Sequence, residues 1–169
     1  QATHRLFEHA GLAAYLATPP EQMVDETEVT RLHRTLRADF GPEMAAEAAR
    51  HAGLRTADYL LANRIPRPVQ ALLKVLPAPL AARVLLSAIR RHAWTFAGSG
   101  TFTAVAGQPV VLTIRNNPLC KGLSADAPAC DFYAAVFERL FRVLVHARAS
   151  VAETACEARG DAECRFELR

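Results

Sequence analysis

The sequence predicts an α+β protein, with a helical N-terminal part (residues 1–93) and a hairpin-helix-hairpin part (residues 94–169) around a small antiparallel sheet. Three observations predict it. Apolar residues recur at helical intervals through residues 1–93. β-branched and aromatic residues become dense only after Trp94, and the last residues alternate between apolar and charged. With 169 residues, no internal repeat and no linker, we expect one domain over residues 1–169.

The helical part divides at its glycine and proline residues. The first segment, HRLFEHAGLAAYL, stops at the sequence TPPEQ, and a second helix is expected over about residues 27–40. Gly41 and Pro42 break that helix, and Pro42 opens a third one, because proline is tolerated at the first helical position. Two further short helices, the last reaching about His92, are delimited by Pro66, Pro68, Pro77 and Pro79.

The second part begins with a predicted hairpin, TFTAVAGQPVVLTIRN, whose strands are separated by Ala-Gly-Gln-Pro. The following segment, ACDFYAAVFERLFRVLVHARA, returns to a helical period with a very broad apolar face. Such a helix must be buried on two sides or face a ligand or partner. At the end of the chain a strand is predicted, because charged residues alternate with Ala162, Cys164, Phe166 and Leu168.

Composition and charge exclude several classes of protein. Hydrophobic residues make up 51% of the chain and charged residues 22%, so the chain is neither disordered nor of low complexity. The net charge of +3 is spread without a basic run, and we expect no nucleic-acid partner. No apolar stretch reaches the ~20 residues of a transmembrane helix. The chain starts at Gln1, which suggests processing or trimming, and no signal peptide is visible, so we expect a cytoplasmic protein.

The last residues, SVAETACEARGDAECRFELR, place two cysteines around an Arg-Gly-Asp turn. If residues 159–161 form a three-residue loop, Ala158 pairs with Ala162, and Cys156 lies opposite Cys164. Their β-carbons would then be ~4.5–5.5 Å apart. That distance is short enough for the two thiols to share a metal ion.

Cys130 and Glu153 complete a set of three sulfurs and one oxygen, which fits tetrahedral Zn²⁺. Because Glu153 precedes Cys156 by an odd number of positions, it would point to the opposite face of a flat strand, so a bulge or a strand end is needed. Two alternatives stay open. One is a disulfide between Cys156 and Cys164, which a reducing cytosol disfavours. The other is a set of packed free thiols.

The same cysteine and glutamate pattern, behind the Asn-Pro pair at residues 117–118, resembles the 4-vinyl reductase domain family. That family includes bacteriochlorophyll-biosynthesis proteins and the effector-sensing domains of aromatic-responsive transcription activators. The resemblance covers about residues 95–169 by motif and the helical part by general layout. It implies a fold resembling the TRAPP trafficking subunits, frequent dimerisation and an apolar ligand pocket.

In the sensor branch of this family the matching residues hold zinc. The resemblance therefore implies a structural zinc site in this chain at Cys130, Glu153, Cys156 and Cys164. Cys120 has no place in the motif, and we expect it to be a buried or exposed free thiol.

The chain shows no ATPase or DNA-binding region, so it resembles the bacteriochlorophyll-pathway members, which are usually labelled vinyl reductases of divinyl protochlorophyllide. Reducing a vinyl group needs a hydride source. The sequence GSGTFTAVAG precedes a strand instead of joining a strand to a helix, so it is a weak dinucleotide signal. The cysteine spacing matches no ferredoxin pattern, and no catalytic residues can be assigned. We therefore expect a binding protein rather than an enzyme.

A ligand site is suggested at the junction of the two parts. Trp94 could stack on a macrocycle, and His92 could ligate a central Mg²⁺ or hydrogen-bond a carboxylate. The cations that could pair with propionates are Arg90, Arg91 and Arg115. The ordinary alternatives are a core position for Trp94 and a solvated helix end for the cations.

The resemblance and the missing redox residues lead to one hypothesis: an accessory protein of bacteriochlorophyll biosynthesis. It would bind a porphyrin intermediate, of the Mg-protoporphyrin or divinyl protochlorophyllide type, and present it to pathway enzymes such as magnesium chelatase or the following methyltransferase. Two alternatives stay open, a genuine 8-vinyl reductase of divinyl protochlorophyllide and a small-molecule sensor domain. The resemblance also implies a possible homodimer.

Overall fold

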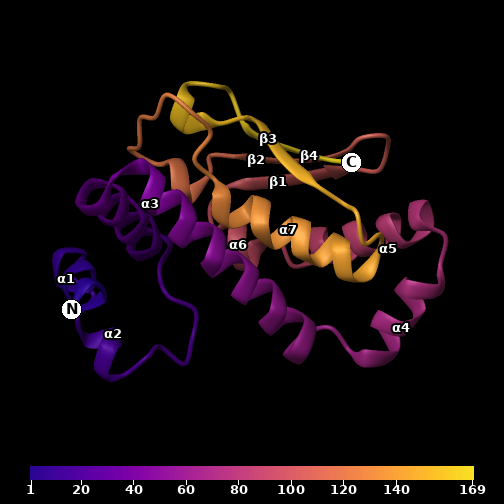
Figure 1. Ribbon diagram of the computed structural model, residues 1–169, viewed down its shortest axis with the longest axis horizontal. Coiled ribbons are helices and arrows are strands. Elements are labelled where there is room, and N and C mark those ends of the chain that lie inside the picture. The colour runs from indigo at the N-terminus through magenta and orange to yellow at the C-terminus, as the bar shows by residue number, and fades with distance from the viewer.

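The computed structural model describes the whole chain, residues 1–169, as helices around one sheet (Figure 1). The helices of the first part are α1 (Ala2–His9), α2 (Ala14–Ala17), α3 (Glu26–Asn63), α4 (Arg67–Val75), α5 (Ala78–Arg91) and α6 (Trp94–Ala97). The second part contains β1 (Thr101–Val105), β2 (Val110–Arg115), the 3₁₀ turn η1 (Pro118–Cys120), α7 (Asp131–Leu144), β3 (Val151–Ala155), the 3₁₀ turn η2 (Glu157–Arg159) and β4 (Cys164–Leu168). The predicted α+β class, with its helix-first order, is confirmed.

The sheet is antiparallel, with the strand order β1-β2-β4-β3. β1 and β2 form the predicted hairpin, in register from Val105 opposite Val111 to Thr101 opposite Arg115. The predicted closing strand is β4, which pairs with β2 on one side and β3 on the other. Its alternation places every second side chain, beginning with Cys164, in the core.

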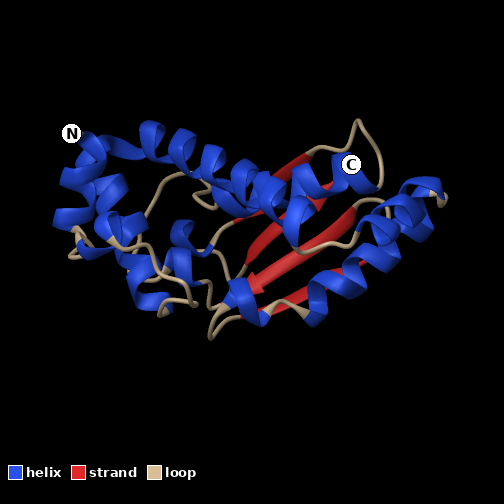
Figure 2. Cartoon of the chain, turned by 90° about the horizontal axis from the view of Figure 1, so that it is seen from below, coloured by secondary structure: helices blue, strands red, loops and turns tan.

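The helices lie on one face of the sheet, and none covers the other face (Figure 1 and Figure 2). α7 crosses the covered face, α3 packs on the outer side of α7, and α5 lies against β1. The broad apolar face of α7 is therefore buried on two sides, as its sequence required. On the sheet side, the ring centroid of Phe137 lies 5.4 Å from that of Phe166 in β4. On the other side, α3 approaches closely at Gly53, where a β-carbon would collide with the backbone oxygen of Phe132.

The predicted break in the second helical segment lies inside α3. Gly41 has φ 82° and ψ 165°, outside the helical region, and the helix resumes at Pro42. The first helix differs from the prediction, because it is divided into α1 and α2. Gly11, with φ 67°, turns the chain between them, a conformation that favours glycine. The short helix α6 was not predicted.

α4 and α5 lie at the end of the molecule opposite α1 and α2 (Figure 1). Proline residues delimit both helices, as predicted, with Pro66 at the N-cap of α4 and Pro77 at the N-cap of α5. The inner face of α5 packs on β1 and α7. Nowhere in the chain is a helix both long and apolar enough to cross a membrane.

Candidate metal centre

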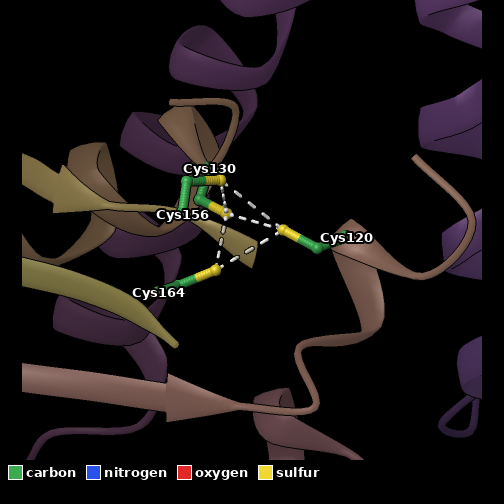
Figure 3. Close-up of side chains that lie close together, drawn as sticks. All are labelled: Cys120, Cys130, Cys156 and Cys164. Carbon is green, nitrogen blue, oxygen red and sulfur yellow. Dashed lines mark hydrogen bonds between the residues drawn. The ribbon is translucent and has the colours of Figure 1, made fainter. Parts of the chain in front are cut away.

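Four cysteine side chains from four separate segments meet at the end of the sheet where β4 begins (Figure 3). Cys120 ends η1, Cys130 precedes α7, Cys156 follows β3, and Cys164 begins β4. All four are buried, and none forms a disulfide. In Figure 3 their sulfur atoms point toward one common centre.

The sulfur atoms are spaced as in a tetrahedral metal site. The Sγ atom of Cys120 lies 3.4 Å from that of Cys130, 3.8 Å from that of Cys156 and 3.5 Å from that of Cys164. The Sγ atom of Cys130 lies 3.9 Å from that of Cys156 and 3.6 Å from that of Cys164. Four sulfurs at the ~2.3 Å Zn–S bond length of a tetrahedral site are about 3.8 Å apart. The cluster is therefore compatible with one metal ion bound by four thiolates.

The β3–β4 hairpin brings two of these cysteines together. Its register shifts between Glu153 and Ala155, which is the bulge that the sequence required for Glu153. Beyond the bulge, Ala155 lies opposite Arg165, so the next residue of each strand toward the turn is a cysteine. Cys156 and Cys164 thus face each other just past the paired part of the hairpin.

The loop of this hairpin is longer than the predicted three residues. Ala158 does not pair with Ala162, because residues 157–159 form η2 instead. Asp161 holds this turn. Its carboxylate accepts a hydrogen bond from the backbone N–H of Cys156 at 2.8 Å, and its backbone N–H donates to the Cys156 carbonyl at 3.2 Å.

Asn117 holds the sulfur cluster from within the core. It is fully buried, and its Nδ2 donates to the Sγ atoms of Cys130 and Cys164, both at 3.2 Å. Its Oδ1 accepts from the backbone N–H of Leu119 at 3.0 Å. The backbone N–H of Glu157 also donates to the Sγ of Cys164, at 3.4 Å. Such hydrogen bonds orient metal ligands and stabilise their charge.

The cluster lacks a positive side chain to balance thiolate charge. Hydrogen bonds from Cys120, Cys156 and Cys164, followed by burial, raise the pKa of the Cys130 thiol well above its ordinary value. No lysine or arginine donates to any of the four sulfurs. The nearest favourable dipole is the N-terminus of α7, where Cys130 is the N-cap residue. A divalent cation would supply the missing charge, because metal-bound thiols are deprotonated.

Glu153 lies beside the cluster and not within it. Its Oε2 accepts a hydrogen bond from the backbone N–H of Cys130 at 2.8 Å, and its Oε1 is buried without a partner. Burial first, and then the charge of Cys156, raise the pKa of this carboxyl to about 9. Cys120 stands in the fourth position of the tetrahedron, where we predicted the carboxylate of Glu153.

Cys120 is the member of the cluster that sequence reasoning missed. It is free and buried, as one form of the prediction had it, but it lies among the other three cysteines. The Asn117-Pro118 pair carries the available signal, because an asparagine cap followed by proline opens a helical turn. That turn is η1, which is tied to α3 by the Thr30 hydroxyl donating to the Pro118 carbonyl at 2.7 Å.

The residues predicted to bind a ligand enclose no space. Trp94 is 63% exposed, so it is not the core residue of the ordinary alternative. Arg90, Arg91 and His92 are exposed at the end of α5. Arg115, on β2, donates from Nε to the carboxylate of Glu163 at 2.9 Å.

A cavity of about 780 Å³ lies at the other end of the sheet, between the β1–β2 turn, the start of α5 and the end of α7. None of the five residues predicted for the ligand site lines it. Its apolar walls include Ala82, Val110, Phe141 and Leu168. Its polar side chains are Arg83, Gln108, His146 and Arg169. The volume is in the ~300–1,000 Å³ range of small-molecule and cofactor sites.

Residues 110–169 match the sequence profile of the 4-vinyl reductase domain. The chain is 54% identical over 150 residues to the Bacteriochlorophyll synthase 23 kDa chain of Cereibacter sphaeroides, covering 89% of this chain and 72% of that protein. It is 42% identical over 158 residues to the Bacteriochlorophyll synthase 23 kDa chain of Rhodobacter capsulatus, covering 93% of this chain and 73% of that protein.

Two solved structures share the fold. The phenol-responsive sensory domain of the transcription activator PoxR, solved with phenol, has a TM-score of 0.52 at 15% identity and covers 87% of this chain and 75% of its own. Subunit 3 of the trafficking protein particle complex from Naegleria fowleri, covalently bound to palmitic acid, has a TM-score of 0.52 at 11% identity and covers 98% and 92%. These identities show the fold alone, and they confirm its predicted likeness to the TRAPP subunits.

Proposed function

This chain belongs to the 4-vinyl reductase domain family, and we propose that it is an accessory protein of bacteriochlorophyll biosynthesis that binds a porphyrin intermediate and presents it to pathway enzymes. The observation that carries the proposal is the 54% and 42% identity to two proteins named Bacteriochlorophyll synthase 23 kDa chain. The ligand would be of the Mg-protoporphyrin or divinyl protochlorophyllide type. The receiving enzymes would be magnesium chelatase or the following methyltransferase.

The cavity at the Leu168 end of the sheet offers a site for such a ligand. Val110, Phe141 and Leu168 supply apolar contact for a macrocycle, and Arg83, which forms no ion pair within the chain, supplies a cation for a propionate. His146 accepts a hydrogen bond on Nδ1 from the backbone N–H of Arg148 at 3.3 Å, which leaves Nε2 for the ligand.

The competing site is the helix junction predicted from the sequence. Trp94 and the neighbouring His92, Arg90 and Arg91 form an exposed surface there, which would touch a macrocycle on one side only. A concave site removes more of an apolar ligand from water than a surface does. We therefore favour the cavity, and variants of the two sites separate them.

Zinc completes the proposal as a structural element, held by the thiolates of Cys120, Cys130, Cys156 and Cys164. Four thiolates close a tetrahedral shell and leave no open position for a substrate, so the ion would support the fold and perform no chemistry. In this arrangement Glu153 orients Cys130 through its backbone N–H. The alternative is that Glu153 replaces Cys120 as the fourth ligand.

Titration of the intact protein with Mg-protoporphyrin, followed by the Soret band, tests the binding proposal. We expect a saturable shift at micromolar ligand. The double variant Arg83→Gln, His146→Ala should weaken binding at least about tenfold, because a charge-assisted hydrogen bond of ~1.5–3 kcal/mol is lost. The matched double variant Arg90→Gln, His92→Ala should bind as the unchanged protein does.

Three results would contradict parts of this proposal. The absence of a saturable shift in the unchanged protein removes the porphyrin ligand. Loss of binding only in the Arg90, His92 variant moves the site to the helix junction. Steady conversion of a divinyl to a monovinyl substrate by the pure protein, with NADPH or reduced ferredoxin, establishes a reductase instead.

A further inference from the structure

The outer side of the α4–α5 pair carries a group of exposed aliphatic side chains. Leu72 is 53% exposed, Val75 78% and Leu80 46%, and Val69 and Val84 are exposed by 40% and 45%. Each is on a helix whose opposite side is already used. In α5, for example, Leu80 and Val84 are four positions apart on one face, whereas Leu85 and Ile89 are buried on the other. These aliphatic side chains therefore have no partner within the chain.

The same surface is positively charged without compensation. No aspartate or glutamate occurs between Asp58 and Asp126. The exposed cations on and beside the two helices are Arg64, Arg67, Lys74, Arg83, Arg90 and Arg91. None of them takes part in the ion pairs of the chain, all of which lie outside residues 59–114.

We propose that this α4–α5 surface, formed by the aliphatic and cationic residues named above, docks the protein on a membrane surface that contains anionic lipids. Exposed aliphatic groups flanked by lysine and arginine are the composition of helices that lie in the headgroup region of a bilayer. The aliphatic side chains would enter the boundary between headgroups and acyl chains. The cations would meet lipid phosphates.

A second copy of the chain is a poorer occupant of this surface. A two-fold interface places the same patch on both partners. Each partner would then present unpaired arginine and lysine side chains to those of the other, with no acidic residue in either helix to balance them. Such like-charge contacts cost several kcal/mol in an interface.

A specific protein partner is also disfavoured, because the surface offers little that a protein interface uses. Its apolar residues are all aliphatic, whereas interface cores are enriched in tyrosine, tryptophan and phenylalanine. Gln70, the amide side chain of α4, is turned inward, where its Nε2 donates to the carbonyls of Leu61 and Ile65 at 2.6 and 2.8 Å. Apolar and cationic groups without directional hydrogen bonding suit a fluid bilayer surface.

Sedimentation of the intact protein with vesicles tests the proposal. The vesicles are phosphatidylcholine alone, or phosphatidylcholine mixed with phosphatidylglycerol, in low and high salt. We expect binding to the mixed vesicles in low salt and its loss in high salt. The double variant Arg67→Gln, Lys74→Gln should lower the partition coefficient about fivefold for each cation removed. The double variant Leu72→Ser, Val75→Ser should also release the protein, because it removes the buried aliphatic area.

The matched control is the double variant Arg55→Gln, Met44→Ser in α3. Met44 is 59% exposed and Arg55 is exposed without an ion pair, so the control removes the same kinds of group elsewhere on the surface. It should bind vesicles as the unchanged protein does, and all variants should keep the circular dichroism spectrum of the unchanged protein.

Each of three outcomes would overturn the proposal. The first is no binding of the unchanged protein to mixed vesicles in low salt. The second is equal loss in the α3 control, which would make binding a property of total charge. The third is a dimer that Leu72→Ser, Val75→Ser dissociates, which would give this surface to a second copy. The porphyrin titration is independent of all three, because it uses no lipid and other residues.

Discussion

The Sγ atoms of Cys120 and Cys130 lie 3.4 Å apart, which joins the turn after β2 to the first residue before α7. Cys156 and Cys164 bring the β3–β4 hairpin to the same point. The cluster thus links the interior of the sheet to the helix that covers it. Any ion bound there would hold these elements together.

Replacing Cys164 by serine should release the metal and destabilise the final hairpin. Structural zinc contributes directly to folding free energy, and the loss should exceed about 4 kcal/mol of unfolding free energy. Chemical denaturation and hydrogen exchange of the β3 and β4 amides measure the effect. Ala152→Ser, at an exposed position of β3, is the control. Unchanged exchange in Cys164→Ser would show that the hairpin does not depend on the cluster.

Asn117→Ala should lower the free energy of unfolding by about 2–4 kcal/mol, because it leaves the buried N–H of Leu119 and two sulfurs without partners. Asn117→Asp keeps an acceptor for Leu119 but places negative charge against the sulfurs, so it should cost at least as much. Equilibrium denaturation compares the two with Asn63→Ala, at an exposed position. An aspartate variant as stable as the unchanged protein would contradict a thiolate cluster.

Glu26 should make stability depend on pH in acid. Lys121 and Ser99 hydrogen-bond its carboxylate, and the bond to Lys121 is the largest cause that lowers its pKa to about 2. An unfolded glutamate has a pKa near ~4.3. The folded pKa is therefore the lower one, so the stabilisation is present above about pH 4.3 and is lost as the pH falls toward 2.

Glu26→Gln should consequently lose stability at neutral pH and show a shallower decline between about pH 4.3 and 2. The measurement is the free energy of unfolding of both proteins across this range. The comparison between the two cancels any acid release of metal, which both share. Parallel curves would mean that Glu26 does not couple to folding.

Gly53→Ala should destabilise the protein, although alanine is the better helix former by ~1 kcal/mol. The added β-carbon would lie 2.9 Å from that of Ala135 and against the backbone of Phe132, so α3 and α7 would have to separate. Overpacking of this kind costs about 1–3 kcal/mol. Thermal unfolding tests it against Ala48→Ser, at an exposed position of α3. A higher melting temperature in Gly53→Ala would show that the crossing is loose.

The elements with a local signal could be predicted from the sequence. The break at Gly41, the β1–β2 hairpin and the alternation of β4 each depend on residues close together in the chain. The bulge near Glu153 followed from the parity of its distance to Cys156. The hairpin loop did not follow, because the side chain of Asp161 selects a 3₁₀ turn over a tighter one.

The fourth cysteine and the cavity depend on contacts between distant segments. Nothing in residues 121–129 shows that the chain returns Cys120 to Cys130, and the contacts of Asn117 with the sulfurs exist only after they converge. The cavity is lined by α5, the β1–β2 turn, α7 and β4, none of which carries a ligand motif alone. Trp94 attracted attention as the single tryptophan, yet it faces solvent.

The four-thiolate centre is decided by the metal content of protein purified without chelator, measured for the unchanged chain, Cys120→Ser and Glu153→Gln. We expect about one zinc per chain in the unchanged protein and in Glu153→Gln, and almost none in Cys120→Ser, because thiolates dominate the affinity of such a site. Zinc retained by Cys120→Ser and lost from Glu153→Gln would place the carboxylate in the shell instead. No metal in the unchanged protein, with all four thiols reacting readily in the native state, would contradict the metal centre itself.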